Sequence, residues 1–135
     1  MSWNALIFNG RDVPQTLVGA SSDWRPYPIG SPQDVIGAID EAAANISWTP
    51  AGYGTLDQDH FSIELHVEVE EEVIDSIGVR VVGDGEPVPV LFQICKSNGW
   101  VLFDNQRGDL INTEDLNGSW NRFVEWRDKA TNKEE

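Results

Sequence analysis

The stretch that decides the fold is residues 61–83, which read FSIELHVEVEEEVIDSIGVRVVG. Apolar and polar side chains alternate over residues 61–70 and again over residues 76–83. A period of two is typical of a strand with one buried and one exposed face. The acidic segment 70–75 between the two runs allows them to pair as an antiparallel hairpin. The stretch therefore predicts an antiparallel sheet with one apolar face and one acidic face.

A helix is expected before this hairpin. Ser31 is followed by Pro32 and Asp34, which places a hydroxyl at the N-cap, a proline at the first helical position and a carboxylate in the first turn. Apolar residues then recur at helical spacing and form one stripe. The stripe consists of Val35, Ile36, Ile39, Ala42, Ala43 and Ile46. Further upstream, residues 5–8 predict a short strand, and residues 11–30 predict a long connection held by Trp24 and Tyr27.

A second helix, a hairpin and a third helix are expected after residue 83. Prolines at 87 and 89 fit the first turn of a helix that runs to about Asn98 and ends at Gly99 in the left-handed conformation. Residues 100–104 and 109–111 predict two short strands joined by a turn. The last helix is expected to start at Ser119. Its predicted buried residues are Trp120, Phe123 and Val124, with Trp126 as a further candidate.

These elements predict a single α+β domain over residues 1–128. Its antiparallel sheet would consist of a meander plus a hairpin, with two to three helices packed on one face. Residues 129–135 are expected to form a frayed tail. The chain has 135 residues, of which 40% are hydrophobic, and this is enough to bury a core.

The charge balance excludes some classes of partner. Nine Lys and Arg stand against 23 Asp and Glu, so the formal net charge is −14. Direct binding to nucleic acid or to an anionic membrane is therefore not expected. The single cysteine, Cys95, excludes an internal disulfide, and the N-terminus shows neither a secretory signal nor a membrane span. We expect a soluble protein of the cytoplasm.

The acidic residues are concentrated in one part of the sequence. From Asp57 to Glu86 there are ten acids and one base, Arg80, which is a net charge of −9 in 30 residues. One interpretation is a solvated strand face that resists aggregation. The other is a docking surface for a basic protein, whose association such a field accelerates. The candidate partner-binding residues are Asp57, Asp59, Glu64, Glu68, Glu70, Glu71, Glu72 and Asp75.

No catalytic, cofactor or metal site is predicted, and we expect a protein that is not an enzyme. His60 and His66 are not accompanied by an HExxH motif, paired cysteines or a nucleophile elbow. Cys95 lies on the buried stripe of its helix and is expected to act as a small apolar residue. Trp24 and Trp48 lie in loops near prolines, where exposed indoles would be able to stack on a sugar.

Three segments resemble small bacterial immunity proteins of contact-dependent or type VI secretion systems: residues 53–57, residues 61–65 and residues 90–105, with the core CKSNGWVLFD at 95–104. The resemblance covers roughly residues 30–128. It implies a cytoplasmic, non-enzymatic inhibitor that occludes the active site of a basic toxin delivered by a competing cell. Two alternatives stay open: a nucleic-acid mimic that inhibits a DNA-binding enzyme, and a small-ligand or carbohydrate module that uses exposed tryptophans. The oligomeric state is left open.

Overall fold

The two alternating runs form neighbouring antiparallel strands. The computed structural model describes residues 2–14, 16, 24–105, 108–111 and 118–132. In it β4 comprises Phe61–His66 and β5 comprises Ser76–Gly83, with His66 opposite Gly78. β5 has the predicted bounds. β4 ends four residues before the predicted end at Glu70: the Val67 amide still donates to the Gly52 carbonyl at 2.9 Å, in register with the β3–β4 pairing, and residues 68–73 form a loop.

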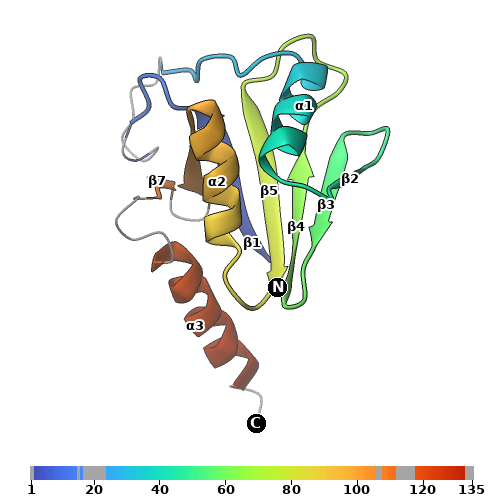
Figure 1. Ribbon diagram of the computed structural model, residues 1–135. Coiled ribbons are helices and arrows are strands. Elements are labelled where there is room, and N and C mark those ends of the chain that lie inside the picture. Colours follow the sequence, from blue (N-terminus) through green and yellow to red (C-terminus); the bar gives the residue numbers. More distant parts are fainter. Residues whose placement is uncertain (1, 15, 17–23, 106–107, 112–117, 133–135) are drawn as a thin grey trace.

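These strands belong to a seven-stranded sheet of order β2-β3-β4-β5-β1-β6-β7, in which every pair is antiparallel (Figure 1). The other strands are β1 (Trp3–Asn9), β2 (Ser47–Trp48), β3 (Tyr53–Asp57), β6 (Trp100–Asp104) and β7 (Asp109–Leu110). β1 lies in the middle, between β5 and β6. The predicted antiparallel α+β fold is confirmed. The strands β2 and β3 were not predicted from the sequence.

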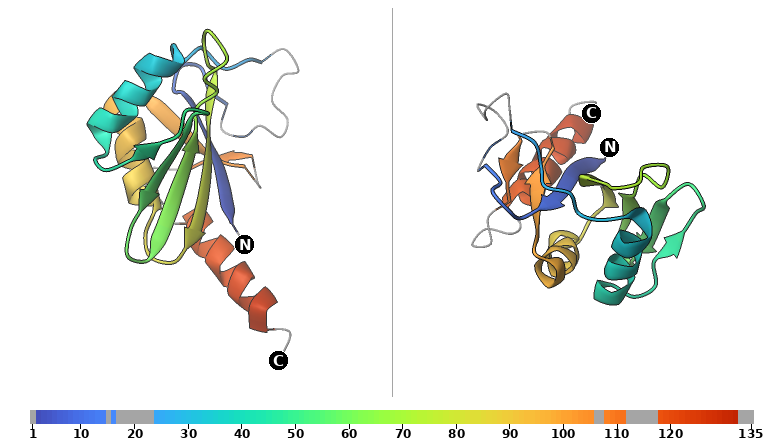
Figure 2. Two further views of the ribbon diagram at one scale, coloured as in Figure 1. Left: turned by 90° about the vertical axis from the view of Figure 1, so that its right-hand side faces the viewer. Right: turned by 90° about the horizontal axis from the view of Figure 1, so that it is seen from above.

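Two helices cover one face of the sheet, as Figure 2 shows from the side and from above. In α1 (Pro32–Ala42) the Asp34 amide donates to the Ser31 hydroxyl at 3.3 Å, which confirms the predicted N-cap. The helix ends at Ala42, so Ile46 follows it rather than belonging to it. α2 (Val88–Asn98) ends as predicted at Gly99, whose φ of 69° is left-handed.

The hydrophobic core fills the space between this face and the two helices. Side chains of alternate residues in β1, β4 and β5 point into it, together with the apolar stripes of α1 and α2. The largest fully buried side chains are Trp3, Trp120, Phe103, Ile7, Ile39, Ile63, Leu65, Ile77, Leu91, Ile94, Leu102 and Val35. The predicted stripe of α2 (Leu91, Ile94 and Cys95) is among the buried residues.

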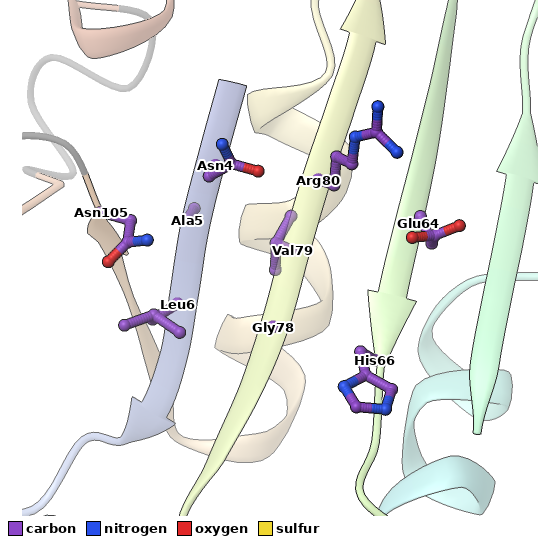
Figure 3. A pocket seen from close by; sticks show the side chains of 9 residues that line it. All are labelled: Asn4, Ala5, Leu6, Glu64, His66, Gly78, Val79, Arg80 and Asn105. Atoms are coloured by element: carbon purple, nitrogen blue, oxygen red, sulfur yellow. The ribbon is translucent and has the colours of Figure 1, made fainter. Parts of the chain in front are cut away.

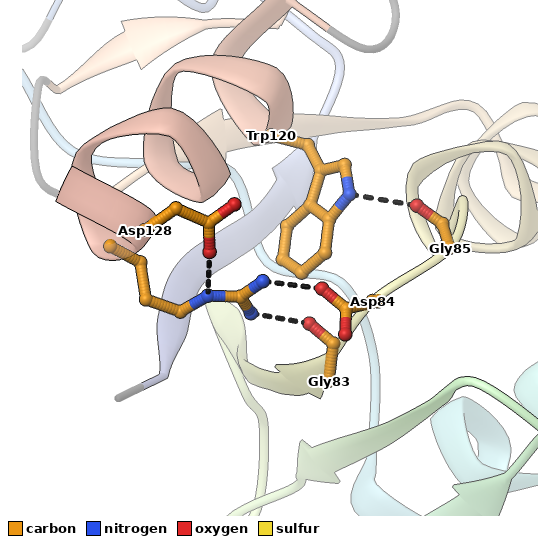
Figure 4. A network of polar contacts seen from close by, with 6 residues as sticks. Gly83, Asp84, Gly85, Trp120 and Asp128 are labelled. Atoms are coloured by element: carbon orange, nitrogen blue, oxygen red, sulfur yellow. Dashed lines mark hydrogen bonds and ion pairs between the residues drawn. The ribbon is translucent and has the colours of Figure 1, made fainter. Parts of the chain in front are cut away.

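The third helix, α3 (Gly118–Asn132), packs against the end of the sheet where β1 begins and β5 ends. The Trp120 ring meets Trp3 edge-on, with centroids 6.0 Å apart, and its indole Nε1 donates to the Gly85 carbonyl at 2.9 Å. The Arg127 guanidinium pairs with Asp84 and donates to the Gly83 carbonyl at 2.6 Å (Figure 4). These contacts fasten the helix to the β5–α2 connection.

The C-terminal half of α3 projects away from the sheet (Figure 1). Trp126 lies on this half and is 54% exposed, so its predicted burial is wrong. Phe123 and Trp120, about one and two turns earlier in the helix, are buried as predicted. The helix also continues past residue 129, where we expected a frayed tail to begin, up to Asn132. Residues 133–135 lie outside the described part of the chain.

None of the described helices lies on the second face of the sheet, and the described residues cover only its β1–β6 part. There the Trp24 ring meets Phe8 edge-on at 5.7 Å, and its Nε1 donates to the Asp12 carbonyl at 3.2 Å. Tyr27 receives the Arg11 guanidinium over its ring at 4.5 Å. The predicted connection is thus held by Trp24 and Tyr27, although its residues 15 and 17–23 lie outside the described part. We call the rest of this face, on β3, β4, β5 and the start of β1, the uncovered face.

Candidate functional site

The eight acids singled out in the sequence lie in three places. Glu68, Glu70, Glu71, Glu72 and Asp75 are exposed in the β4–β5 connection, residues 67–75, which we call the acidic loop. Asp57 and Asp59 are exposed at the β3–β4 turn, at the other end of β4. Glu64 is half-buried in the middle of β4, on the uncovered face.

The two acidic ends act as separate electrostatic regions. β4 has six residues and is therefore about 20 Å long. This length exceeds the Debye length of about 8 Å at physiological salt, so charges at the two ends are largely screened from each other. The structure brings five of the eight acids together and does not join them to Asp57 and Asp59. The single acidic sheet face expected from the alternation is therefore not formed.

The acidic loop is held by backbone hydrogen bonds at both of its ends. The Val67 amide bonds to Gly52, and Ile74 exchanges two hydrogen bonds of 2.8 and 2.9 Å with the segment Ile29 and Gly30. The Ile74 side chain is buried beneath the loop. A loop tied down in this way presents its carboxylates without a large loss of backbone entropy on binding.

Beside the acidic loop lies a hollow of about 310 Å³, which we call the loop hollow. It is lined by Glu68, Glu71, Val73, Ile74, Asp75 and Ser76. Val73 is 51% exposed, and three carboxylate side chains surround it. Within the described part of the chain, none of the five loop acids makes an ion pair or a side-chain hydrogen bond. The loop hollow therefore offers an apolar floor and unneutralised negative charge.

A second hollow lies on the uncovered face and is shown in Figure 3; we call it the sheet hollow. Its volume is about 230 Å³, and its lining includes Asn4, Leu6, Glu64, His66, Gly78, Arg80 and Asn105. Strand register creates it. Asn4, Arg80 and Glu64 face one another across three strands, and in the next row Leu6, Gly78 and His66 do the same.

Gly78 is the reason that the second row contains a gap. A Cβ atom at this position would have a single neighbouring atom within 4 Å, the His66 Cβ at 3.6 Å. The space beside Leu6 and His66 is therefore open because residue 78 has no side chain to fill it. A smaller hollow of about 150 Å³ lies beyond Glu64 and Arg80, so these two side chains border both.

The polar side chains around the sheet hollow are not paired with one another. Glu64 and Arg80 are directly opposite in register, a position that favours a cross-strand ion pair. No ion pair between them is nevertheless formed among the described residues. Of the residues that the structure describes, Arg80, Glu64, Asn4 and Asn105 have no ion pair or hydrogen bond through their side chains. All four groups are available to a ligand.

The aromatic candidates have structural roles in this fold. The Trp48 indole donates to Asp40 in α1 at 2.8 Å and lies so close to Gly54 that a Cβ there would be 2.7 Å from the ring. Trp24 packs on Phe8, as described above. Neither indole presents a free platform for a sugar. The exposed aromatic pair is instead Tyr53 and His66, which stack with centroids 4.3 Å apart between the sheet hollow and the acidic loop.

Metal ligands and a reactive thiol are the remaining candidates for chemistry in the described residues. No three His, Cys, Asp or Glu side chains are grouped there so that they could hold a metal ion. Cys95 is buried, and burial raises the pKa of its thiol to about 12, so it is protonated at neutral pH. A protonated thiol without an adjacent base is not a nucleophile.

Comparison with known proteins adds no relative: no family model, no curated protein and no solved structure matches the chain. Among the described helices, none is long and apolar enough to cross a membrane. The site must therefore be interpreted from its own geometry.

Sequence reasoning missed part of the sheet hollow. Asn4 and Asn105 are far apart in sequence and meet because β1 lies between β5 and β6. The backbone amide of Asn105 donates to the backbone carbonyl of Asn4 at 3.1 Å. Arg80 carried a signal, since it is the one base between Asp57 and Glu86. Gly78, a glycine inside a predicted strand, was a second signal of a local gap.

Proposed function

We propose that the chain is a non-enzymatic interaction protein that binds a basic partner protein through the acidic loop. The loop hollow is the observation that carries this proposal. A Lys or Arg side chain entering it would lay its aliphatic stem on Val73 and place its charged end among Glu68, Glu71 and Asp75. Amphipathic cationic side chains suit such a combination of apolar floor and carboxylate rim better than a neutral ligand does.

The charge of the acidic loop supports a rapid encounter with such a partner. Its five acids are exposed and, in the described part of the chain, unpaired, and they add to a net charge of −14 on the whole chain. A field of one sign raises the association rate of an oppositely charged protein by about 10- to 1,000-fold and slows acidic competitors. The anchored backbone of the loop keeps this field in one place.

We further propose that the partner is a toxin and that the chain is an immunity protein that occludes its active site. The resemblance of residues 53–57, 61–65 and 90–105 to immunity proteins supports this identity, as does the acidic surface. A nucleic-acid mimic needs two rows of carboxylates, whereas the acidic loop offers one patch. A carbohydrate module based on Trp24 and Trp48 is disfavoured because both indoles are occupied by contacts within the fold.

The proposal is tested by charge reversal in two matched triple variants. The first changes Glu68, Glu70 and Glu71 to Lys in the acidic loop. The second changes Glu41, Glu86 and Glu125 to Lys, which alters the net charge equally at exposed positions elsewhere. Each tagged protein, with the unchanged chain as reference, is used in pull-downs from the native lysate together with the product of the neighbouring gene, at low and at high salt.

The unchanged chain and the second variant are expected to retain one basic protein, and the first variant is expected to lose it. Stopped-flow mixing with that protein should show association slowed at least tenfold at low salt in the first variant alone. The retained protein should arrest growth when expressed by itself, and co-expression of the chain should restore growth. Equal retention by both triple variants, or no basic protein at any salt, would contradict the proposal.

A further inference from the structure

We infer that the sheet hollow is a binding site for a small zwitterion, of which an α-amino acid is the simplest example. The site is distinct from the acidic loop, which begins beyond His66 at the end of β4. It combines a cation, an anion and two carboxamides around a gap in the side chains of the sheet (Figure 3). Each of these features selects one property of the ligand.

Arg80 selects a carboxylate. Its guanidinium is a planar fork that donates two parallel hydrogen bonds to the two oxygens of a carboxylate. Within the described residues, no group of the chain occupies this fork. The carboxamides of Asn4 and Asn105 line the same hollow and provide further N–H donors.

Glu64 selects a positive charge next to that carboxylate. It lies opposite Arg80 on the neighbouring strand and borders the same hollow, so a ligand that is only an anion would be repelled at close range. The net charge of −14 adds repulsion at long range, most strongly for a dianion such as phosphate. An ammonium group pairs with Glu64 and brings the ligand's net charge to zero, which removes both penalties.

The gap at Gly78 limits the size of the ligand. The hollow of about 230 Å³ is smaller than the pockets of about 300–1,000 Å³ that hold drug-sized molecules. Next to the gap, Leu6 provides an apolar wall. The side chain of a bound amino acid would occupy the space at Gly78, where β5 has no side chain.

Titration of the 15N-labelled full chain with L-alanine and L-leucine, followed by amide NMR, tests the inference. We expect saturable shifts centred on Leu6, Gly78 and Arg80, with a dissociation constant of about 1 mM, because a small ligand in an open site has few contacts. N-acetyl-L-alanine keeps the carboxylate without the ammonium, and methylammonium provides the ammonium without the carboxylate. Each should bind at least tenfold more weakly.

Variants of the site come with matched controls on the helices. R80Q and E64Q should each weaken L-alanine binding at least tenfold, whereas K96Q and E41Q, which make the same changes in charge at exposed positions of α2 and α1, should leave it unchanged. G78V should fill the gap and weaken L-alanine binding. If G78V fails to fold, G78A replaces it in the same measurement, because a Cβ at residue 78 would make only an ordinary van der Waals contact.

The absence of saturable shifts with either amino acid would overturn the inference. Equal binding of N-acetyl-L-alanine, or full binding by E64Q, would show a carboxylate site without a role for Glu64 and would overturn the zwitterion. Neither result bears on the acidic loop, since the titration contains no protein partner.

Discussion

In β5, neighbouring residues face opposite sides of the sheet and meet opposite environments. Ile77, Val79 and Val81 are buried beneath α1 and α2, whereas Gly78, Arg80 and Val82 lie on the uncovered face. The same alternation separates Ile63 and Leu65 from Glu64 and His66 in β4. The covered face supplies most of the burial that holds the domain together, and Phe8 and Phe103 add to it on the β1–β6 part of the other face. The uncovered face is therefore able to carry a charge, an amide or no side chain at all.

The largest expected effect contrasts two adjacent residues. Ile77→Ala removes a fully buried side chain and should lower the free energy of unfolding by about 2–5 kcal/mol. Gly78→Ala should raise it by about 0.5–1 kcal/mol, because alanine restricts the unfolded strand more than glycine does. Urea unfolding followed by tryptophan fluorescence measures both. A similar loss of unfolding free energy in both variants would mean that the two faces of β5 contribute equally to stability.

A smaller effect is expected at the end of the sheet, which belongs to neither face. Arg127→Met removes the pair with Asp84 and the hydrogen bond to the Gly83 carbonyl, and we expect a loss of about 1–2 kcal/mol. Asp84 is largely exposed, so water screens part of this pair. Lys129→Met removes only an exposed pair with Glu125 at 3.8 Å and should change stability by less than about 0.5 kcal/mol. Equal effects would show that α3 is not fastened through Arg127.

The helices that cover the face depend in turn on their own ends. Ser31→Ala removes the hydroxyl that accepts the Asp34 amide, and a loss of about 1 kcal/mol is expected in thermal or urea unfolding. Ser97→Ala in α2 is the control, since the Ser97 hydroxyl donates to the Gln93 carbonyl within the helix and satisfies no orphan amide. Its effect should be close to zero. A loss as large as that of Ser31→Ala would contradict the capping role.

The last and smallest effect is the pH dependence of stability that Cys95 contributes, which appears only in alkaline solution. Burial raises the pKa of its thiol from 9.0 to about 12, so the folded state favours the neutral thiol. The resulting stability is fully present below pH 9 and is lost as the pH rises from 9 towards 12. Cys95→Ala should remove this component of the pH dependence. At pH 8, a thiol reagent should label the folded chain far more slowly than the chain in urea, and equal rates would show that the covered face is permeable.

Local signals in the sequence identified most elements of the covered face. The Ser31–Pro32 start of α1, the alternation of β5 and the glycine that ends α2 are each specified by neighbouring residues. β3 was missed because Gly54 interrupts its alternation, and the reason for this glycine is the Trp48 ring that lies on it. Trp126 was misjudged because helical spacing shows a stripe but does not show how far the sheet extends beneath it.

The candidate sites were predictable only in part, for a related reason. The five carboxylates of the acidic loop are close in sequence, so their grouping could be predicted. Their separation from Asp57 and Asp59 depends on where β4 ends, and the apolar–polar alternation continues past that end as far as Glu70. The sheet hollow depends on pairing between β1, β5 and β6, which periodicity cannot reveal.

The central position of β1 has a consequence for how the chain folds. This strand precedes both of its neighbours in sequence: Trp3 pairs with Val81 and Ala5 with Asp104, so it waits for residues that are synthesised much later. Contacts so distant in sequence slow folding, because a long loop must close before they form. Until β6 emerges, β1 keeps an unpaired edge on the side away from β5, which another nascent chain could occupy. The middle of the sheet therefore forms through the pairs that are most distant in sequence.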